Sequence, residues 1–441
     1  MSEILSLAAA RSRMGRVFYG WWMVVAGLLI MAVNGGTYFY GFGVFFVPLE
    51  TEFGWSRTVL AGAFSLSRLE AGLTGPIGGW LVDRFGPRRL MLVGWVLFGL
   101  SFIVLSQVNS LWAFYAVFVL GLAVAGSLGS GTPVQTSIAN WFVRKRSQAI
   151  GIAMSGAGVA GIMVPGMAWL IEQYSWRGAA IIAGLAALVF CLPLSLVMRH
   201  RPERYGLLPD GDDSSTQSLL HRRKPATWRF LHRWADSSRE TEVDFTTREA
   251  LKTSAFWLIS AFFTVRMLVT AAVVVHLAPF FTDLGVSLEV SAMILGSVAT
   301  ISVVGRVLFG WLGDVFDKRY VLGICYSMMA ISLLILAFAN NWWQTILFIA
   351  LYSPSYGGSV PLVPALRGQY FGRKTFGTIH GLTNTVAIVG TAGGPLLAGY
   401  IYDATGSYRL AFLIFAAITA LGIILVMATR QPKLARAPAA L

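Results

Sequence analysis

The chain is divided into about twelve long apolar stretches separated by short polar breaks, and a helix that crosses a bilayer needs about 20 such residues. Hydrophobic residues make up 56% of the 441 and charged residues only 12%, whereas soluble domains have roughly a quarter charged residues. We therefore predict twelve transmembrane helices. Their approximate ranges are 18–48, 57–80, 89–107, 111–141, 148–171, 178–198, 253–281, 289–312, 320–339, 342–370, 376–402 and 409–429.

The basic residues are distributed unevenly between the polar breaks. Most of the 34 Lys and Arg residues lie at the amino terminus, in alternate breaks, in the central polar segment and in the carboxy tail. The opposite breaks carry only Arg57, Arg177 and Arg409. This positive-inside pattern places both termini and the central segment in the cytoplasm. The net charge of +14 is therefore a topology signal, and nucleic acid is not expected as a partner.

A short charged turn occurs twice, each time where an apolar stretch ends: Gly79–Arg89 reads GWLVDRFGPRR and Gly310–Arg319 reads GWLGDVFDKR. Further landmarks recur at nearly the same spacing: Trp141–Lys145 with Tyr370–Lys374, Pro165 with Pro395, and Trp176-Arg177 with Tyr408-Arg409. We predict two equivalent six-helix bundles at residues 1–198 and 253–441, joined by a cytoplasmic linker at 199–252. Parallel repeats of this kind place a substrate cavity between the two halves.

The repeated turn resembles the loop signature of the major facilitator superfamily, G-x-x-x-D-R/K-x-G-R/K-R/K. The resemblance implies an all-α membrane protein with the major facilitator fold, which works by alternating access. In such a protein the charges of the turn latch neighbouring helix ends on the cytoplasmic face and gate the transport cycle. The gating candidates are Asp83, Arg84, Arg88, Arg89, Asp314 and Arg319. The second copy has Val315 and Asp317 in place of a basic residue and a glycine, so its latch is expected to be weaker.

A narrower resemblance begins at Trp141, where WFVRKRSQAIGIAMSGAGVAG continues to Gly161. It is similar to the Y-F-x-K/R-R-x-x-A-x-G-I/L-A-x-A-G-x-x-G signature of the monocarboxylate transporter family, which also includes oxalate exchangers. The segment Tyr19–Val25 resembles that family's first-helix opening. The resemblance implies a secondary active transporter of a small monocarboxylate, with proton symport as a hypothesis. The alternative is a carrier of another small solute: an organic anion, a sugar or a drug-like compound.

Arg306 is the first candidate for the anion site. It lies eight residues before Asp314, roughly 12 Å along a helix and hence near the bilayer midplane. Inserting a charged side chain at this depth of the bilayer costs at least about 2.5–3.5 kcal/mol, so a functional or structural role is expected for it. A guanidinium matches a carboxylate with two hydrogen bonds. The resemblance adds that monocarboxylate transporters carry a substrate-pairing arginine at the matching place. The alternative is that Arg306 snorkels or braces a neighbouring helix.

Four other residues are candidates for substrate binding: Arg266, Tyr40, Ser302 and Asn384. Mammalian members of the resembled family have an aspartate where this chain has Ser302 and a first-helix lysine where it has Tyr40, so their proton relay is not carried over. Oxalate exchangers use a lysine where this chain has Ala387. The resemblance therefore favours a monoanion over oxalate. Arg266 lies near the middle of its stretch, and binding and bracing are equally open for it.

Two titratable residues are candidates for carrying a coupled proton. Glu70 is the only acid well inside the apolar stretches, and burial raises a carboxyl pKa. It is equally open to serving as a brace for an arginine on another helix. His276 is the second candidate, because histidine is the side chain best suited to exchanging a proton at physiological pH, and a hydrogen-bonded structural role is the alternative. Arg367 and His380 lie near cytoplasmic helix ends and are expected to snorkel.

The sequence gives no sign of an enzyme. It contains no G-x-S-x-G, H-E-x-x-H or Walker-type phosphate loop, and Cys191 and Cys325 lie apart within apolar stretches. No cofactor or metal is expected. The expected partners are the lipid bilayer, a small carboxylate and a proton, with the chain acting as a monomer. The compact plan with few long loops favours a multi-pass protein of a bacterial inner membrane, and a eukaryotic plasma membrane is the alternative.

Overall fold

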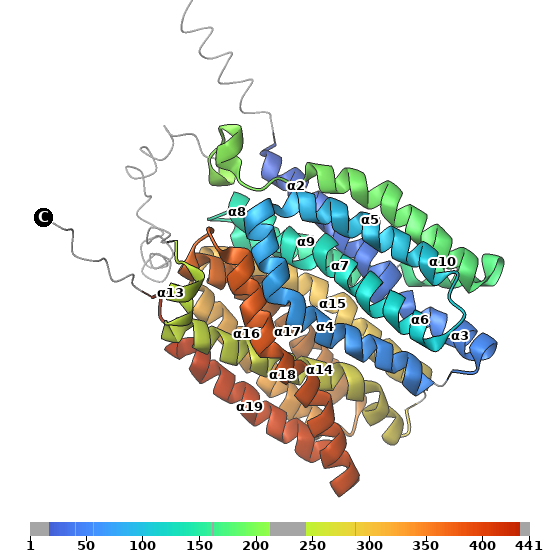
Figure 1. Cartoon of the computed structure of the whole chain (residues 1–441). Helices are drawn as coiled ribbons and strands as arrows, with labels where there is room; N and C mark the ends of the chain where they lie inside the picture. The colour runs from blue at the N-terminus through green and yellow to red at the C-terminus, as the bar shows by residue number, and fades with distance from the viewer. Residues whose placement is uncertain are drawn as a thin grey trace, which may run out of the picture.

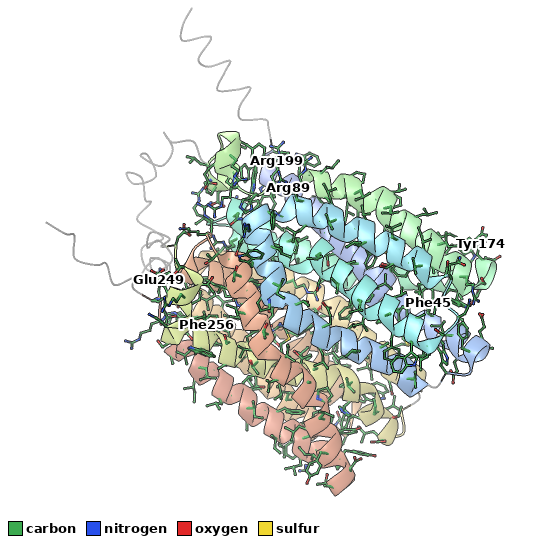
Figure 2. The ribbon with its side chains drawn as sticks, viewed as in Figure 1. Phe45, Arg89, Tyr174, Arg199, Glu249 and Phe256 are labelled. Atoms are coloured by element: carbon green, nitrogen blue, oxygen red, sulfur yellow. The ribbon has the colours of Figure 1, made fainter. Side chains whose placement is uncertain are left out.

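The computed structural model describes residues 17–39, 41–55, 57–160, 163–211, 244–286 and 288–432. These residues form helices and connecting turns, with no strand among them. The long helices lie side by side with their axes running in broadly the same direction (Figure 1). Figure 2 places Arg89, Arg199 and Glu249 at one end of the bundle and Tyr174 at the other.

The helices from residue 19 to 197 are called the N-terminal half. Their order and bounds are α2 (Tyr19–Asn34), η1 (Gly35–Phe39), η2 (Gly41–Phe45), α3 (Phe46–Phe53), α4 (Arg57–Phe85), α5 (Pro87–Leu105), α6 (Leu111–Tyr115), η3 (Ala116–Ala123), α7 (Val124–Gly129), α8 (Gly131–Trp141), α9 (Arg146–Val159) and α10 (Met163–Val197). Ser175 has a left-handed φ of 62° inside α10 and separates it into two helical parts. That break falls between the predicted stretches 148–171 and 178–198.

The short helices η5 (Pro202–Tyr205), η6 (Pro209–Gly211) and α13 (Thr247–Leu251) flank the part of the linker that is not described. The helices from residue 254 onward are called the C-terminal half. They are α14 (Ser254–Asp283), α15 (Leu288–Val315), α16 (Lys318–Ala337), α17 (Trp342–Phe371), α18 (Phe376–Thr405) and α19 (Arg409–Ala428). We call the end of the bundle where α10 ends and α14 begins the linker end.

Ten helical stretches of the described chain are long and apolar enough to cross a membrane. The other two of the twelve predicted helices correspond to α4, which carries polar and charged residues, and to α9 together with the first part of α10. The predicted all-α fold of transmembrane helices is therefore confirmed.

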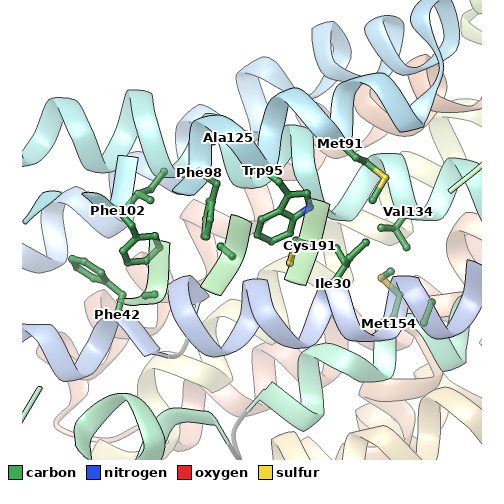
Figure 3. Packing of buried hydrophobic residues seen from close by; sticks show 14 of the residues in the cluster. Ile30, Phe42, Met91, Trp95, Phe98, Phe102, Ala125, Val134, Met154 and Cys191 are labelled. Carbon is green, nitrogen blue, oxygen red and sulfur yellow. The ribbon is translucent and has the colours of Figure 1, made fainter. Parts of the chain in front are cut away.

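Aromatic and aliphatic side chains fill the interior of the N-terminal half. Trp95, Phe98 and Phe102 of α5 point toward Ile30 of α2 and Phe42 of η2 (Figure 3). The indole of Trp95 also donates a 2.8 Å hydrogen bond to the Gly129 carbonyl. Buried aliphatic and aromatic side chains likewise pack the C-terminal half. Each half thus has its own core.

The two halves meet along a seam in which α4 packs against α18 and α9 packs against α15. Glycines bring the backbones together there. A Cβ at Gly79 would lie 2.0 Å from the Gly377 carbonyl oxygen, and one at Gly381 would lie 2.2 Å from that of Gly75. A Cβ at Gly151 would lie 2.3 Å from the Arg306 carbonyl oxygen. Small residues are what allow membrane helices to approach this closely.

Candidate functional site

At the linker end, Asp83 reaches across the seam. It lies in the last turn of α4, and its carboxylate accepts hydrogen bonds from the backbone N–H groups of Gly377 (3.0 Å) and Thr378 (2.8 Å) and from the Thr378 hydroxyl (2.7 Å). These donors belong to the first turn of α18, where helix N–H groups lack internal partners and the helix dipole favours negative charge. Asp83 therefore caps a helix of the opposite half.

Asp314 makes the equivalent contact in the other direction. It lies near the end of α15 and accepts hydrogen bonds from the backbone N–H groups of Ser147 (2.8 Å) and Gln148 (2.7 Å) in the first turn of α9. The two aspartates of the repeated turn thus join the two halves reciprocally. Both were predicted as latch residues, and the second copy keeps its carboxylate contact although its sequence departs from the signature.

The arginines of the repeated turns lie differently. Arg84 stacks on Trp80 of its own helix, with its guanidinium carbon 5.1 Å from the ring centroid, and Arg88 and Arg89 are exposed. Arg319 pairs with Asp317 at 2.7 Å, inside the C-terminal half. Among the described residues, we find no hydrogen bond or ion pair from these four arginines across the seam, and their gating role stays a prediction.

Arg373 does cross the seam at the linker end, which the sequence analysis did not anticipate. Its Nη1 donates to the Asn140 carbonyl at 2.9 Å and to the Glu203 carboxylate at 2.8 Å. The repeat pairing of Tyr370–Lys374 with Trp141–Lys145 was the signal that this loop matters, because it places two basic loops at the same end.

His200 lies next to this contact, just after α10. Its backbone carbonyl accepts a 3.1 Å hydrogen bond from the Asn140 side chain. Burial, together with the positive charges of Arg201 and Arg204, lowers the pKa of its imidazole to about 4. The neutral imidazole is therefore the form that fits this junction near neutral pH.

Arg306 lies on α15 where that helix faces α9. Its side chain is 5% exposed, its Nη1 donates a 2.9 Å hydrogen bond to the Met154 carbonyl, and its Nε is buried without a partner. Gly158 of α9 leaves room for the guanidinium, since a Cβ there would lie 3.3 Å from Nη1. The predicted anion-site residue thus sits at the seam between the halves, with part of its donor capacity unused.

Arg266 on α14 is likewise buried inside the C-terminal half. Its Nη1 donates to the Ser359 hydroxyl at 3.2 Å, and its Nε has no partner. It lies within electrostatic range of Arg306 and of the tyrosines Tyr326, Tyr352 and Tyr356. These neighbours supply polarity but no negative charge.

Arg367 on α17 and His380 on α18 form a pair that the sequence analysis missed. Both were expected to snorkel, and this is wrong, because Arg367 is 1% exposed and His380 5%. The Arg367 Nη1 lies 2.8 Å from the His380 Nδ1, and the Arg367 Nε and Nη2 have no partner. Depth along a helix can be read from sequence, but the direction of a side chain around the helix cannot.

Arg266, Arg306 and Arg367 share one property: within the described chain, none of them forms an ion pair with a carboxylate. Arg266 lies within electrostatic range of both others, so the three act on one region of the C-terminal half and its seam. Buried charges in proteins are ordinarily paired. A cluster of guanidiniums with free donors is suited to holding an anion.

The remaining candidates are spread over the molecule. Ser302 is buried, with its hydroxyl bonded to the Ala299 carbonyl at 2.6 Å, and Asn384 is partly buried on α18. Glu70 accepts a 2.7 Å hydrogen bond from Thr74, one turn on, and its other oxygen has no partner. Tyr40 lies outside the described residues.

His276 has both ring nitrogens engaged. Its Nδ1 lies 3.1 Å from the Tyr408 hydroxyl and its Nε2 lies 3.0 Å from the Pro395 carbonyl oxygen, to which it donates. This arrangement braces α14 against α18 and the start of α19. It matches the structural alternative, and a proton-coupling role for His276 stays a prediction.

Comparisons with known proteins relate this chain to one protein family. The sequence profile of the Major Facilitator Superfamily matches residues 25–313 and 267–440. Monocarboxylate transporter 12 of Mus musculus is 27% identical over 423 residues, covering 90% of this chain and 82% of the relative. Monocarboxylate transporter 13 of Bos taurus is 26% identical, covering 91% and 88%. The solved proton:xylose symporter XylE superposes with a TM-score of 0.69 at 16% identity, covering 94% and 96%, and shows the shared fold.

Proposed function

The chain belongs to the Major Facilitator Superfamily, and on that basis we propose that it carries a small monocarboxylate across a membrane by alternating access. It is a multi-pass transporter and not an enzyme. The observation that carries the choice of substrate is Arg306, a buried guanidinium at the seam between the halves with an unpaired Nε and no carboxylate partner in the described chain.

A small carboxylate suits this guanidinium. A planar fork accepts two carboxylate oxygens at once, and the Nη1 of Arg306 is held only by the Met154 backbone carbonyl. An incoming carboxylate replaces that neutral acceptor with a charged one. The charge-assisted bond offsets the cost of holding the arginine in the membrane. The names of the monocarboxylate transporter relatives support the same substrate class.

Alternating access requires the halves to separate at one end at a time. We infer that residues 1–198 and 253–441 move as the two units, joined by the linker at 199–252. The contacts of Asp83 and Asp314 hold the linker end closed, so this arrangement corresponds to access from the opposite end. By the positive-inside pattern the linker end and both termini face the cytoplasm. The compact plan with few long loops is our reason for proposing a bacterial inner membrane.

The test is uptake of labelled L-lactate, pyruvate and acetate into proteoliposomes containing the parent, R306A, R306K or the exposed control R248K. The parent and R248K are expected to show saturable uptake and counterflow. Both Arg306 variants should lose roughly tenfold to a hundredfold in kcat/KM, because a hydrogen bond to a charged group contributes about 1.5–3 kcal/mol. Parent-like transport by both Arg306 variants would refute the binding site.

A different substrate class is the remaining alternative, and the same assay separates it. An excess of unlabelled xylose, a larger organic anion or a drug-like cation is added as a competitor. Competition by short carboxylates alone supports the monocarboxylate, whereas saturable uptake that only another class inhibits assigns the carrier to that class. An imposed pH gradient tests proton symport: uptake that is indifferent to the gradient rules out proton coupling.

A further inference from the structure

The contact between Arg367 and His380 fixes which ring atom carries a proton. An arginine side chain only donates hydrogen bonds, so at 2.8 Å the His380 Nδ1 must be the acceptor. The imidazole is therefore neutral here, with its one proton on Nε2. Protonating Nδ1 would set two donors against each other and break this contact.

The charges around His380 are one-sided. Arg367 faces it from α17, and Arg266 of α14 lies within electrostatic range of Arg367. On α4, which packs against α18, the Asp83 carboxylate is already engaged by the first turn of α18, and the Glu70 carboxylate accepts a hydrogen bond from Thr74 of its own helix. The aromatic ring of Phe376 stacks on the imidazole with centroids 5.8 Å apart.

The other elements packed against this part of α18 add no buried charge. Arg248, Glu249 and Lys252, on and just after α13, are exposed, and α8 contains no ionisable residue. Arg409, at the start of α19, lies at the end of the bundle away from the linker. A proton on His380 is thus opposed by Arg367 and, within the described chain, balanced by no acid.

Arg367 and the neighbouring Arg266 have unused hydrogen-bond donors. Within the described residues, the Nε and Nη2 of Arg367 and the Nε of Arg266 are buried without partners. Three unsatisfied donors on two guanidiniums, both at least nine-tenths buried, are costly unless something accepts from them during the working cycle.

We propose that Arg367 and His380 form a second, proton-linked anion site, in which a carboxylate bound by Arg367 and a proton on the His380 Nδ1 bind together. The inference rests on the proposed carrier function. The carboxylate inserts between the two side chains and accepts a hydrogen bond from each, so the Arg367–His380 contact is replaced by two charge-assisted ones. The proton comes from a hydronium ion of the solvent, in which one O–H bond breaks as one N–H bond forms on Nδ1, and no other bond is made or broken.

The coupling follows from electrostatics. Arg367 opposes the protonation of His380, and an anion placed between the two side chains removes that opposition. By linkage, anion binding then favours the proton as strongly as the proton favours the anion. A site with this property carries the two together, which is what symport requires.

The site also lies close to the linker end, where the bound anion and proton would be released. His380 follows Thr378, the residue held by Asp83, by two positions on α18. Separation of the halves at the linker end breaks that latch and uncovers this part of α18. The proton and the anion then reach the linker side in the same step. Neither Glu70 nor His276 combines free arginine donors with this position.

The test counts protons taken up with each bound anion. Calorimetric titration of the purified parent, H380N and the control H200N is run near pH 6.5 in two buffers of different ionisation enthalpy, with the short carboxylate that the parent transports. Asparagine retains an acceptor near the position of Nδ1 but cannot be protonated. We expect about one proton per anion for the parent and H200N, and close to none for H380N, which should bind more weakly.

Proton uptake by H380N equal to that of the parent overturns the proposal, as does a parent that binds the carboxylate with no proton uptake. The second result leaves the carrier function intact, because that depends on saturable transport and Arg306. If H380N does not bind the carboxylate, the proton uptake of the R367Q variant is measured instead. Without Arg367 the imidazole is free to take its proton before the anion arrives, so proton uptake on binding should fall. Parent-like proton uptake by R367Q refutes the proposal.

Discussion

Asp83 and Asp314 occupy equivalent positions in the two halves and each caps the first turn of a helix in the other half, with carboxylate-to-nitrogen distances of 2.7–3.0 Å. The partners correspond as well: Gly377 and Thr378 on α18 stand where Ser147 and Gln148 stand on α9. The internal repeat of the sequence therefore appears in the structure as a pair of exchanged contacts.

Neutralising Asp83 should open the linker end. D83N keeps the shape of the side chain but removes the charge, and each weakened hydrogen bond to a charged group costs about 1.5–3 kcal/mol. With spin labels at R89C and K374C, the distance distribution should shift to longer values in D83N. The control is D403N, an exposed carboxylate near the far end of α18. A D83N distribution that superposes on the control contradicts the latch.

A methyl group on the seam at Gly79 should have the same effect by a different route. A Cβ there would lie 2.0 Å from the Gly377 carbonyl oxygen, so α4 and α18 must move apart. G79A is expected to destabilise the closed linker end by about 1–3 kcal/mol, as overpacking does elsewhere. Its neighbour Gly78 has open space, which makes G78A the matched control. Equal distance distributions for the two variants would show that the close approach is unimportant.

Crowding the Arg306 guanidinium should weaken transport without removing the arginine. A Cβ at Gly158 would lie 3.3 Å from Nη1 and 2.3 Å from a Val303 methyl group. G158A is therefore expected to raise the KM for the transported carboxylate by about tenfold or more, the effect of about 1.4 kcal/mol. G166A, at a position with open space, serves as the control. An unchanged KM in G158A argues that substrate does not approach Arg306 from this side.

The stability of the linker end should depend on pH through His200. Its pKa of about 4 in the folded chain lies below the ordinary 6.5. The unfolded chain therefore binds a proton more readily, so stability is complete above pH 6.5 and is lost as the pH falls toward 4. Because the imidazole is only partly buried, we expect a loss of about 1–2 kcal/mol. Thermal unfolding of the parent from pH 7 to pH 4 should show this loss, and H200N should lack it.

The sequence was sufficient for the fold and for part of the candidate site. Apolar length and the break near Ser175 follow from local composition, and Asp83, Asp314 and Arg306 could be found because a repeated motif gives depth along its helix. Arg367 and His380 were misjudged because both are near helix ends, where snorkelling is the usual outcome. Only packing decides that their side chains turn inward, and packing between α17 and α18 is a long-range property.

If the two halves rock as we propose, the exchanged latches of Asp83 and Asp314 should determine how the linker end comes apart. Both contacts span the same seam, so rigid rocking of one half strains them at the same time, and losing one leaves the whole strain on the other. Separation is then a single cooperative event and not a sequence of partly parted states. A carrier built in this way passes abruptly from sealed to open at this end, which limits the time during which ions could leak through it.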